Sequence, residues 1–251
     1  MQLNKNTLRS DFTKFSNEWT NTPEYNDYIY NYFEQQVSKI EALSLHNDIV
    51  ARYQLGYGEK AFRYLWALVF SQIPLDGKFL EIGVYKGSIL ALSQLISKEL
   101  NLNIQTFGLA PLNNTGDKYS TYPLDNYEYA IAYLYNQLNL DMNNTQFIQG
   151  LSTEDVIKQV AKKQGPYDII YIDGGHDYGT VISDINLCNE MLVDGGLLVM
   201  DDASSHLNFK STHGFTGHAD VATAIADNLD NNSDYRHLFA CGHNRVWIKN
   251  K

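Results

Sequence analysis

Cysteine is scarce in this sequence: Cys188 and Cys241 are the only two in 251 residues. We expect both thiols to be buried and reduced, as in an intracellular enzyme. Long apolar runs are absent too, since no stretch reaches the roughly 18 residues that indicate a membrane-spanning helix. Residues 1–6 lack the charged-then-apolar order of a secretory signal. These absences predict a cytoplasmic protein that does not enter a membrane.

Positive charge is also in short supply. Lysine and arginine total 19 against 29 aspartates and glutamates, which gives a formal net charge of −10. Such a surface repels phosphate backbones and anionic lipids, so neither nucleic acid nor a membrane is an expected partner. The length fits one α/β domain with an added segment, and 44% hydrophobic residues are enough to fill its core.

The added segment is residues 1–58, which are polar, aromatic and typical of helices. Apolar side chains recur there at three- and four-residue steps, which places them on one helical face. They are Tyr25, Tyr28, Ile29, Tyr32, Phe33, Val37 and Ile40. We predict an N-terminal helical extension whose apolar face packs on the main domain. A lid or a homodimer surface is the alternative interpretation.

Residues 59–251 alternate short apolar runs with helical stretches. This alternation predicts a mostly parallel sheet covered by helices on both faces. The connection at 241–244 is too short for a crossover, so the last strand should run antiparallel to its neighbour. The prediction is a Rossmann-like, seven-stranded α/β sheet. Its strands are expected at 78–82, 104–109, 146–149, 168–172, 196–200, 235–240 and 245–248, and its helices at 59–71, 88–100, 126–138, 153–164, 180–192 and 219–229.

A glycine-bearing loop follows the first expected strand, from Glu81 to Gly87. Ligands of open α/β sheets bind beyond the carboxyl ends of the strands. Gly83 and Gly87 permit a tight turn and a close approach of the backbone to a ligand. The spacing is Gly-x-x-x-Gly rather than the dinucleotide fingerprint Gly-x-Gly-x-x-Gly, which disfavours a nicotinamide cofactor. An ordinary strand-to-helix turn is the alternative.

An acidic cluster is expected where the fourth and fifth strands end. Asp173 follows one strand, and Asp201 and Asp202 follow the other. Three neighbouring carboxylates repel one another unless a cation lies between them, and Mg²⁺ is the first choice for such oxygen ligands. His176 lies three residues after Asp173 and titrates near neutrality, so it can accept a proton. The alternatives are a plain turn at Asp173, a helix cap and a structural histidine.

Together these motifs resemble the macrocin O-methyltransferase-like group of class I methyltransferases. The shared pattern is Glu-x-Gly-x-x-x-Gly, Ile-Asp-Gly-Gly-His-x-Tyr, Leu-x-x-Gly-Gly and Asp-Asp, and it extends from about residue 59 to the C-terminus. The resemblance implies that Asp173, Asp201 and Asp202 hold Mg²⁺. It implies catalytic roles for Asp173 and for His176, the latter as the general base. It also implies S-adenosylmethionine as the methyl donor and a hydroxyl of a sugar, glycan or other small polar metabolite as the acceptor.

The resemblance also implies a cofactor site on the first, second, third and fourth strand ends. The expected contacts are Glu81, Gly83, Tyr85, Lys86, Gly87, Ser88, Leu109, Ser152 and Asp173. One position departs from the family pattern. Ala110 stands where an acid commonly binds the ribose hydroxyls, so either Asp117, Asp125 or a backbone group takes over, or the cofactor is held differently. Ser152 is expected to cap the next helix with Asp155, or to border the adenine.

Two further alternatives stay open. A methyltransferase-fold binding protein without activity would explain Ala110, and an NAD-dependent sugar oxidoreductase would share the fold. The segment 203–218 begins at the acidic cluster, and it is long, polar and aromatic, so it is expected to cover substrate. Its histidines, His206, His213 and His218, lack the spacing of a separate zinc site.

Overall fold

The computed structural model describes residues 1–209 and 215–250. Its centre is a seven-stranded sheet with the order β3-β2-β1-β4-β5-β7-β6. Among the described strands only β7 runs antiparallel to its neighbours, which confirms the predicted Rossmann-like sheet. The strands are β1 Lys78–Ile82, β2 Gln105–Ala110, β3 Thr145–Gln149, β4 Tyr167–Ile172, β5 Leu192–Met200, β6 Tyr235–Cys241 and β7 Asn244–Lys249.

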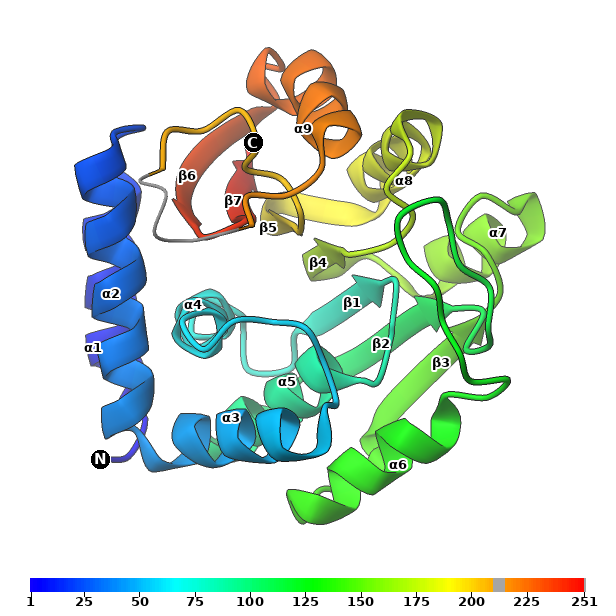
Figure 1. Cartoon of the computed structure of the whole chain (residues 1–251), viewed down its shortest axis with the longest axis horizontal. Helices are drawn as coiled ribbons and strands as arrows, with labels where there is room; N and C mark the ends of the chain where they lie inside the picture. Colours follow the sequence, from blue (N-terminus) through cyan, green and yellow to red (C-terminus); the bar gives the residue numbers. More distant parts are fainter. Residues whose placement is uncertain (210–214, 251) are drawn as a thin grey trace.

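Helices cover both faces of this sheet (Figure 1). The alternation of β4 shows why, because Ile169 and Tyr171 point into one core and Ile170 and Ile172 into the other. The first core is covered by α4 (Phe62–Phe70), α5 (Ser88–Glu99) and α6 (Glu128–Gln137). The second is covered by α7 (Asp155–Gln164), α8 (Tyr178–Met191) and α9 (Ala219–Ile225). Two short helical turns lie at Met142–Asn144 and Ala226–Asp230.

The predicted N-terminal helical segment consists of α1 (Lys5–Glu18), α2 (Pro23–Lys39) and α3 (Glu41–Tyr53). Ile29, Phe33 and Val37 of its apolar stripe have no exposed surface, whereas Tyr28 of the same stripe is exposed. The three buried side chains belong to the first core, which α4 and β6 also line. The stripe therefore packs on the sheet domain.

The parallel register brings the ends of three strands together. Ile82 at the end of β1 pairs with Ile172 of β4, and Ile172 pairs with Met200 of β5. The residues that follow each strand therefore leave the sheet at the same edge. These are the glycine loop, Asp173 and the Asp201-Asp202 pair.

The C-terminal hairpin is tighter than the sequence predicts. Cys241 pairs with Asn244, so the turn is only Gly242 and His243 rather than the expected four residues. Gly242 has a φ of +55°, as the first position of such a turn requires. Because β7 runs antiparallel beside β5, this turn lies beside the end of β5 and delivers His243 to the acidic cluster.

Cys188 and Cys241 are buried and form no disulfide. No helix of the described residues is long and apolar enough to cross a bilayer.

Candidate active site

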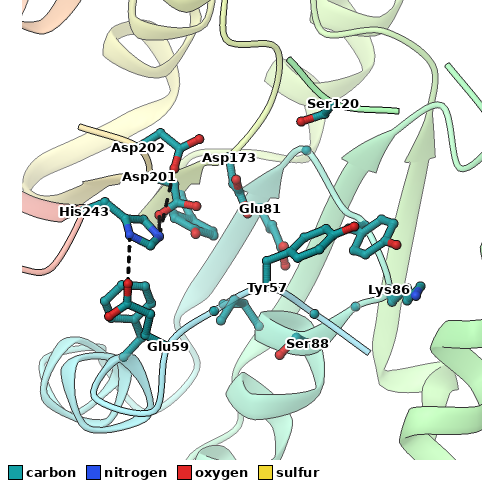
Figure 2. Close-up of a pocket in the computed structure, with 18 of the residues that line it drawn as sticks. Tyr57, Glu59, Glu81, Lys86, Ser88, Ser120, Asp173, Asp201, Asp202 and His243 are labelled. Atoms are coloured by element: carbon teal, nitrogen blue, oxygen red, sulfur yellow. Dashed lines mark ion pairs between the residues drawn. The ribbon is translucent and has the colours of Figure 1, made fainter. Parts of the chain in front are cut away.

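A cavity of about 510 Å³ opens at the carboxyl edge of the sheet. It is lined by the glycine loop, by Asp173, Asp201 and Asp202, and by the segment that precedes α4. Figure 2 shows Asp173, Asp201, Asp202 and Glu81 around this space, with His243 on one side. A second cavity of about 120 Å³ adjoins it and shares Gly83, Tyr85 and Asp173. The predicted cofactor loop and the predicted acidic cluster therefore face one continuous site.

Gly83 brings the loop against the end of β4. Its φ is +101°, and a Cβ built there would lie 1.8 Å from the carbonyl oxygen of Asp173. Its N–H donates to the carbonyl of Leu109 at 2.9 Å, while the N–H of Asp173 donates to the carbonyl of Ile82 at 2.8 Å. No residue other than glycine meets both the conformation and the space.

Glu81 places a carboxyl group beneath this loop. The residue is 3% exposed, and its Oε2 atom has no hydrogen-bond partner. Burial, reinforced by the charge of Asp201, raises the pKa of Glu81 to about 8 although a backbone hydrogen bond opposes the shift. A cationic ligand group in the cavity would satisfy this oxygen and stabilise the carboxylate.

Asp173, Asp201 and Asp202 form the acidic cluster that the sequence predicts (Figure 2). Burial, followed by the charges of Asp201 and Asp202, raises the pKa of Asp173 well above its usual range. Burial is also the largest cause of the raised pKa of Asp201. Asn244 donates to Asp201 Oδ1 at 2.7 Å and so fixes that carboxylate. Carboxylates in this arrangement suit a hard divalent cation, which would offset their repulsion.

His176 lies between two carboxylates. Its Nδ1 is 2.7 Å from Asp117 Oδ2, and its Nε2 is 3.0 Å from Asp202 Oδ2. Burial favours the neutral ring, but the hydrogen bonds to Asp202 and Asp117 outweigh it and raise the pKa of His176. Asp117 therefore orients the ring, and Nε2 is the nitrogen that faces the acidic cluster.

Asp117 was expected only as a substitute ribose ligand, and the structure gives it a different position. Its Oδ1 accepts from the N–H groups of Tyr119 and Ser120, and its Oδ2 accepts from the N–H of His176. Burial opposes ionisation, but these hydrogen bonds together lower the pKa of Asp117 to about 2. The bond to a histidine 59 residues away leaves no signal in the sequence.

Two further histidines face the cluster and were missed as site residues. His218 Nε2 is 3.5 Å from Asp202 Oδ2. His243 Nε2 is 3.4 Å from Asp201 Oδ1, and its Nδ1 is 3.5 Å from Glu59 Oε1 (Figure 2). Burial lowers the pKa of His243, but the nearby acids more than reverse this and raise it to about 9. The donor atoms of Asp201, Asp202 and His243 lie within 4.8 Å of one another.

The structure brings most of the predicted cofactor residues to the cavity, with two exceptions. Leu109 is buried in the second core, where the parallel pairing of β2 with β1 directs its side chain. Ser152 lines neither cavity and lies beside the buried Asp184 instead. The predicted cap is also wrong, because Glu154 is the N-cap of α7 and no side chain caps it. The residues that line the larger cavity are Glu81, Gly83, Tyr85, Lys86, Gly87, Ser88 and Asp173.

The expected ribose position borders the smaller cavity. Ala110 lines it together with Pro111, Leu112 and Asn113. Asp125 lines neither cavity, and both oxygens of Asp117 already accept hydrogen bonds. Asp117, which also lines this cavity, and the backbone groups of residues 110–113 are therefore the remaining candidates for the ribose contacts.

The segment 203–218 lies partly outside the described residues, because 210–214, including His213, are not among them. Phe215 and His218 line the cavity, whereas His206 is exposed. Asn208 donates through its N–H to Asn21 Oδ1 at 2.8 Å, which ties this segment to the N-terminal helices.

Asp184 gives a pH prediction. It has no exposed surface, and burial raises its pKa from 3.8 to about 7. The folded state therefore binds more protons than the unfolded state between these values, so stability falls as pH rises through that window. Asp184→Asn should be more stable than the wild type at pH 8 by roughly 2–4 kcal/mol, with no advantage at pH 4. Urea unfolding at both pH values tests this, with the exposed Asp194→Asn as a control; equal stability of Asp184→Asn and wild type at pH 8 would contradict it.

Residues 80–203 match a family model described as a methyltransferase domain. The chain contains a methyltransferase domain. The prediction of a methyltransferase domain is confirmed, and the matched range contains the glycine loop and the acidic cluster. The chain is also 30% identical over 128 residues to an uncharacterised protein of Acanthamoeba polyphaga mimivirus, covering 51% of this chain and 52% of that protein. The chain thus spans about half the length of that relative.

Solved structures show the same fold. The methyltransferase PaMTH1 of Podospora anserina, solved with S-adenosylhomocysteine bound, superposes with a TM-score of 0.56 at 13% identity, covering 84% of this chain and 88% of that one. The O-methyltransferase TomG of Streptomyces achromogenes, solved with S-adenosylmethionine, gives a TM-score of 0.53 at 11% identity over 84% and 90% of the two chains. At such identities the likeness is one of fold.

Proposed function

We propose that this methyltransferase transfers the methyl group of S-adenosylmethionine to a hydroxyl oxygen with the help of Mg²⁺. The observation that carries the proposal is the single cavity that joins the Glu81–Gly87 loop to the acidic cluster. Methyl transfer needs a donor and an acceptor held within contact of each other, and one cavity with two chemically different ends provides that arrangement.

The cofactor end is supported by a fit to the glycine loop. The unpartnered Glu81 Oε2 suits the ammonium group of the methionine part. The close approach at Gly83 leaves the backbone free of side-chain atoms beside the smaller cavity, which has room for a sugar ring. When bound, S-adenosylmethionine supplies an electrophilic methyl group on a sulfonium.

The acceptor end is supported by the acidic cluster. Asp173, Asp201 and Asp202 would hold Mg²⁺, whose binding favours loss of a proton from a coordinated hydroxyl. Imidazole ligands favour other divalent ions over Mg²⁺, so His243 and His218 make Mn²⁺ a second metal worth testing. Proton acceptance falls to His176, because Asp117 holds Nδ1 and leaves Nε2 directed at the cluster.

The acceptor class that we propose is a sugar, a glycan or another small polar metabolite. The resemblance to the macrocin O-methyltransferase-like group favours sugars. The cavity wall is consistent with this choice, since it carries Tyr57, Tyr119 and Tyr122, whose rings and hydroxyls suit a sugar ring.

The test is transfer of a labelled methyl group from S-adenosylmethionine to a panel of acceptors. The panel should contain hexose glycosides, uronic acid glycosides and a catechol. We expect label in at least one hydroxyl compound, loss of transfer in EDTA, and recovery with Mg²⁺. Undiminished transfer in EDTA would remove the metal from the proposal, and labelling of nitrogen compounds alone would remove the hydroxyl acceptor.

His176→Ala should lower kcat by about 10²- to 10⁴-fold, the range that general base catalysis contributes. Affinity for S-adenosylhomocysteine should stay unchanged, because His176 faces the acidic cluster rather than the glycine loop. Steady-state kinetics and calorimetry measure the two effects. His206→Ala, an exposed histidine of the neighbouring segment, is the matched control. A normal kcat in His176→Ala would clear this residue of the proton-transfer role.

A further inference from the structure

We propose that Arg63 forms an anion site at the start of α5 and binds the carboxylate of the methionine part of S-adenosylmethionine. The inference rests on the proposed function, since it takes the cofactor of that function as the ligand. Arg63 lies on α4, before the first strand and outside the glycine loop. The assignment therefore adds a residue that the cofactor motif does not contain.

Arg63 is a buried cation without a carboxylate partner among residues 1–209 and 215–250. Its side chain is 3% exposed. Nη1 donates to the carbonyl oxygens of Gly58 and Glu59, whereas Nε has no hydrogen-bond acceptor. Within the described part of the chain, no acid forms an ion pair with it, and Tyr30 is the one acidic side chain that contributes to its charge state. Burying an unpaired charge is costly, so an anion that arrives with a ligand would explain the arrangement.

Arg63 faces the same cavity as the start of α5. Gly87 and Ser88 line this cavity together with Arg63. The helix has 12 residues, and its N-cap, Gly87, has no side chain to cap it. The backbone of Leu90 hydrogen-bonds Glu81, so the N–H groups of Ser88 and Ile89 are the ones available to an anion, and the helix dipole favours negative charge there. A helix start and a buried guanidinium thus converge on one place.

The segment that holds Arg63 packs directly on this helix start. A Cβ at Gly56 would lie 3.2 Å from Ser88 Cβ, so the chain before α4 touches the first turn of α5. His46 lies beneath the same turn, with Nε2 2.9 Å from the carbonyl oxygen of Ser88. Burial, and then the charge of Arg63, lower the pKa of His46 to about 3. Because His46 is neutral, Arg63 is the buried cation of this corner.

Two of the unpartnered buried groups that line the cavity are charged, with opposite signs. Glu81 Oε2 and Arg63 Nε both lack partners, and both residues line the same space. A ligand that carries an ammonium and a carboxylate on one carbon would satisfy both at once. The amino-acid end of the cofactor has this chemistry, whereas a simple anion would leave Glu81 unmatched.

Lys86 is the competing cation at the cavity. It is partly exposed, and its Nζ donates to the carbonyl of Gln54 at 2.8 Å while lying over the Tyr85 ring. The ammonium group of Lys86 is thus in contact with water and already has the Gln54 carbonyl and the Tyr85 ring as partners. Water weakens the attraction of an exposed cation for a carboxylate, which is why Arg63 rather than Lys86 is assigned.

The test compares two ligands by calorimetry on the full chain. S-adenosylhomocysteine carries the amino-acid end, and 5′-methylthioadenosine lacks it. We expect Arg63→Met to weaken the binding of S-adenosylhomocysteine by about 10- to 100-fold, the range for a hydrogen bond to a charged group. The affinity for methylthioadenosine should stay unchanged. Arg63→Lys keeps the charge, so it should weaken the binding of S-adenosylhomocysteine less than Arg63→Met does. It should also leave the binding of methylthioadenosine unchanged. Lys86→Met tests the competing cation, and Lys98→Met, an exposed lysine in the last turn of α5, is the control that should change neither affinity.

Equal weakening of both ligands by Arg63→Met and Arg63→Lys would mean that Arg63 only supports the fold, which would overturn the assignment. Selective loss in Lys86→Met, with none in Arg63→Met, would move the carboxylate to Lys86. A wild type that binds neither ligand would overturn the proposed function itself. Binding of methylthioadenosine by each variant shows that its site is folded.

Discussion

Gly83→Ala should abolish measurable binding of S-adenosylhomocysteine and destabilise the fold by about 2–5 kcal/mol. The new Cβ would lie 1.8 Å from the carbonyl oxygen of Asp173, and the backbone would keep a φ of +101°. Neither conflict can be relieved by a side-chain rotation, because the obstructing atom belongs to the backbone of Asp173, directly after β4. Any relief must move the glycine loop away from the acidic cluster, which separates the two ends of the site.

Gly195→Ala is the matched control for this substitution. Gly195 also has a positive φ, +79°, but no atom lies within 4 Å of a Cβ built there. Gly195→Ala should therefore lower the free energy of unfolding by only about 1–2 kcal/mol, the cost of a positive φ in a residue with a Cβ, and leave ligand binding intact. Thermal unfolding and calorimetry on both variants separate strain from steric conflict. Normal binding in Gly83→Ala would contradict the placement of the cofactor on this loop.

Asp201→Asn should lower methyl transfer by about 10²- to 10³-fold, the cost of removing one preorganised electrostatic contact. The chain should remain folded, because the substitution removes a buried charge that burial and Asp202 already disfavour. Its melting temperature should therefore equal or exceed that of the wild type when metal is absent. The wild type, in contrast, should gain more stability from added Mg²⁺ than the variant.

Asp194→Asn serves as the control for Asp201→Asn, because Asp194 lies on β5 with a side chain that is 68% exposed. It should change neither methyl transfer nor the response to Mg²⁺. Labelled-methyl assays and thermal shifts with and without Mg²⁺ report both effects. Full transfer by Asp201→Asn, or an undiminished thermal shift with Mg²⁺, would show that this carboxylate does not hold the metal.

The sequence could predict the sheet and the strand-end motifs because both depend on local patterns. Alternation of apolar runs and helical stretches determines the parallel sheet. Asp173 and Asp201 each follow a strand of that sheet directly, so the register of parallel neighbours brings them together. The tight turn at Gly83 could be predicted for the same reason, since its neighbours along the chain define the turn.

Other parts of the site depend on contacts that sequence order does not reveal. His243 reaches Asp201 because the last hairpin turn has two residues, which depends on a positive φ at Gly242. Asp117 reaches His176 from a loop between β2 and α6. Arg63 lies on α4, which precedes the glycine loop and whose sequence is mostly apolar, as expected of a helix in the core. The error at Ser152 has a related cause, because burial beside Asp184 outweighs the capping pattern.

The central claim is that the cavity at the carboxyl edge of the sheet binds S-adenosylmethionine. Calorimetric titration of the purified chain with S-adenosylhomocysteine, and separately with NAD⁺, tests it most directly. We predict one S-adenosylhomocysteine per chain, loss of that binding in Gly83→Ala, and no heat with NAD⁺. Absence of S-adenosylhomocysteine binding, or saturable binding of NAD⁺, would contradict the claim.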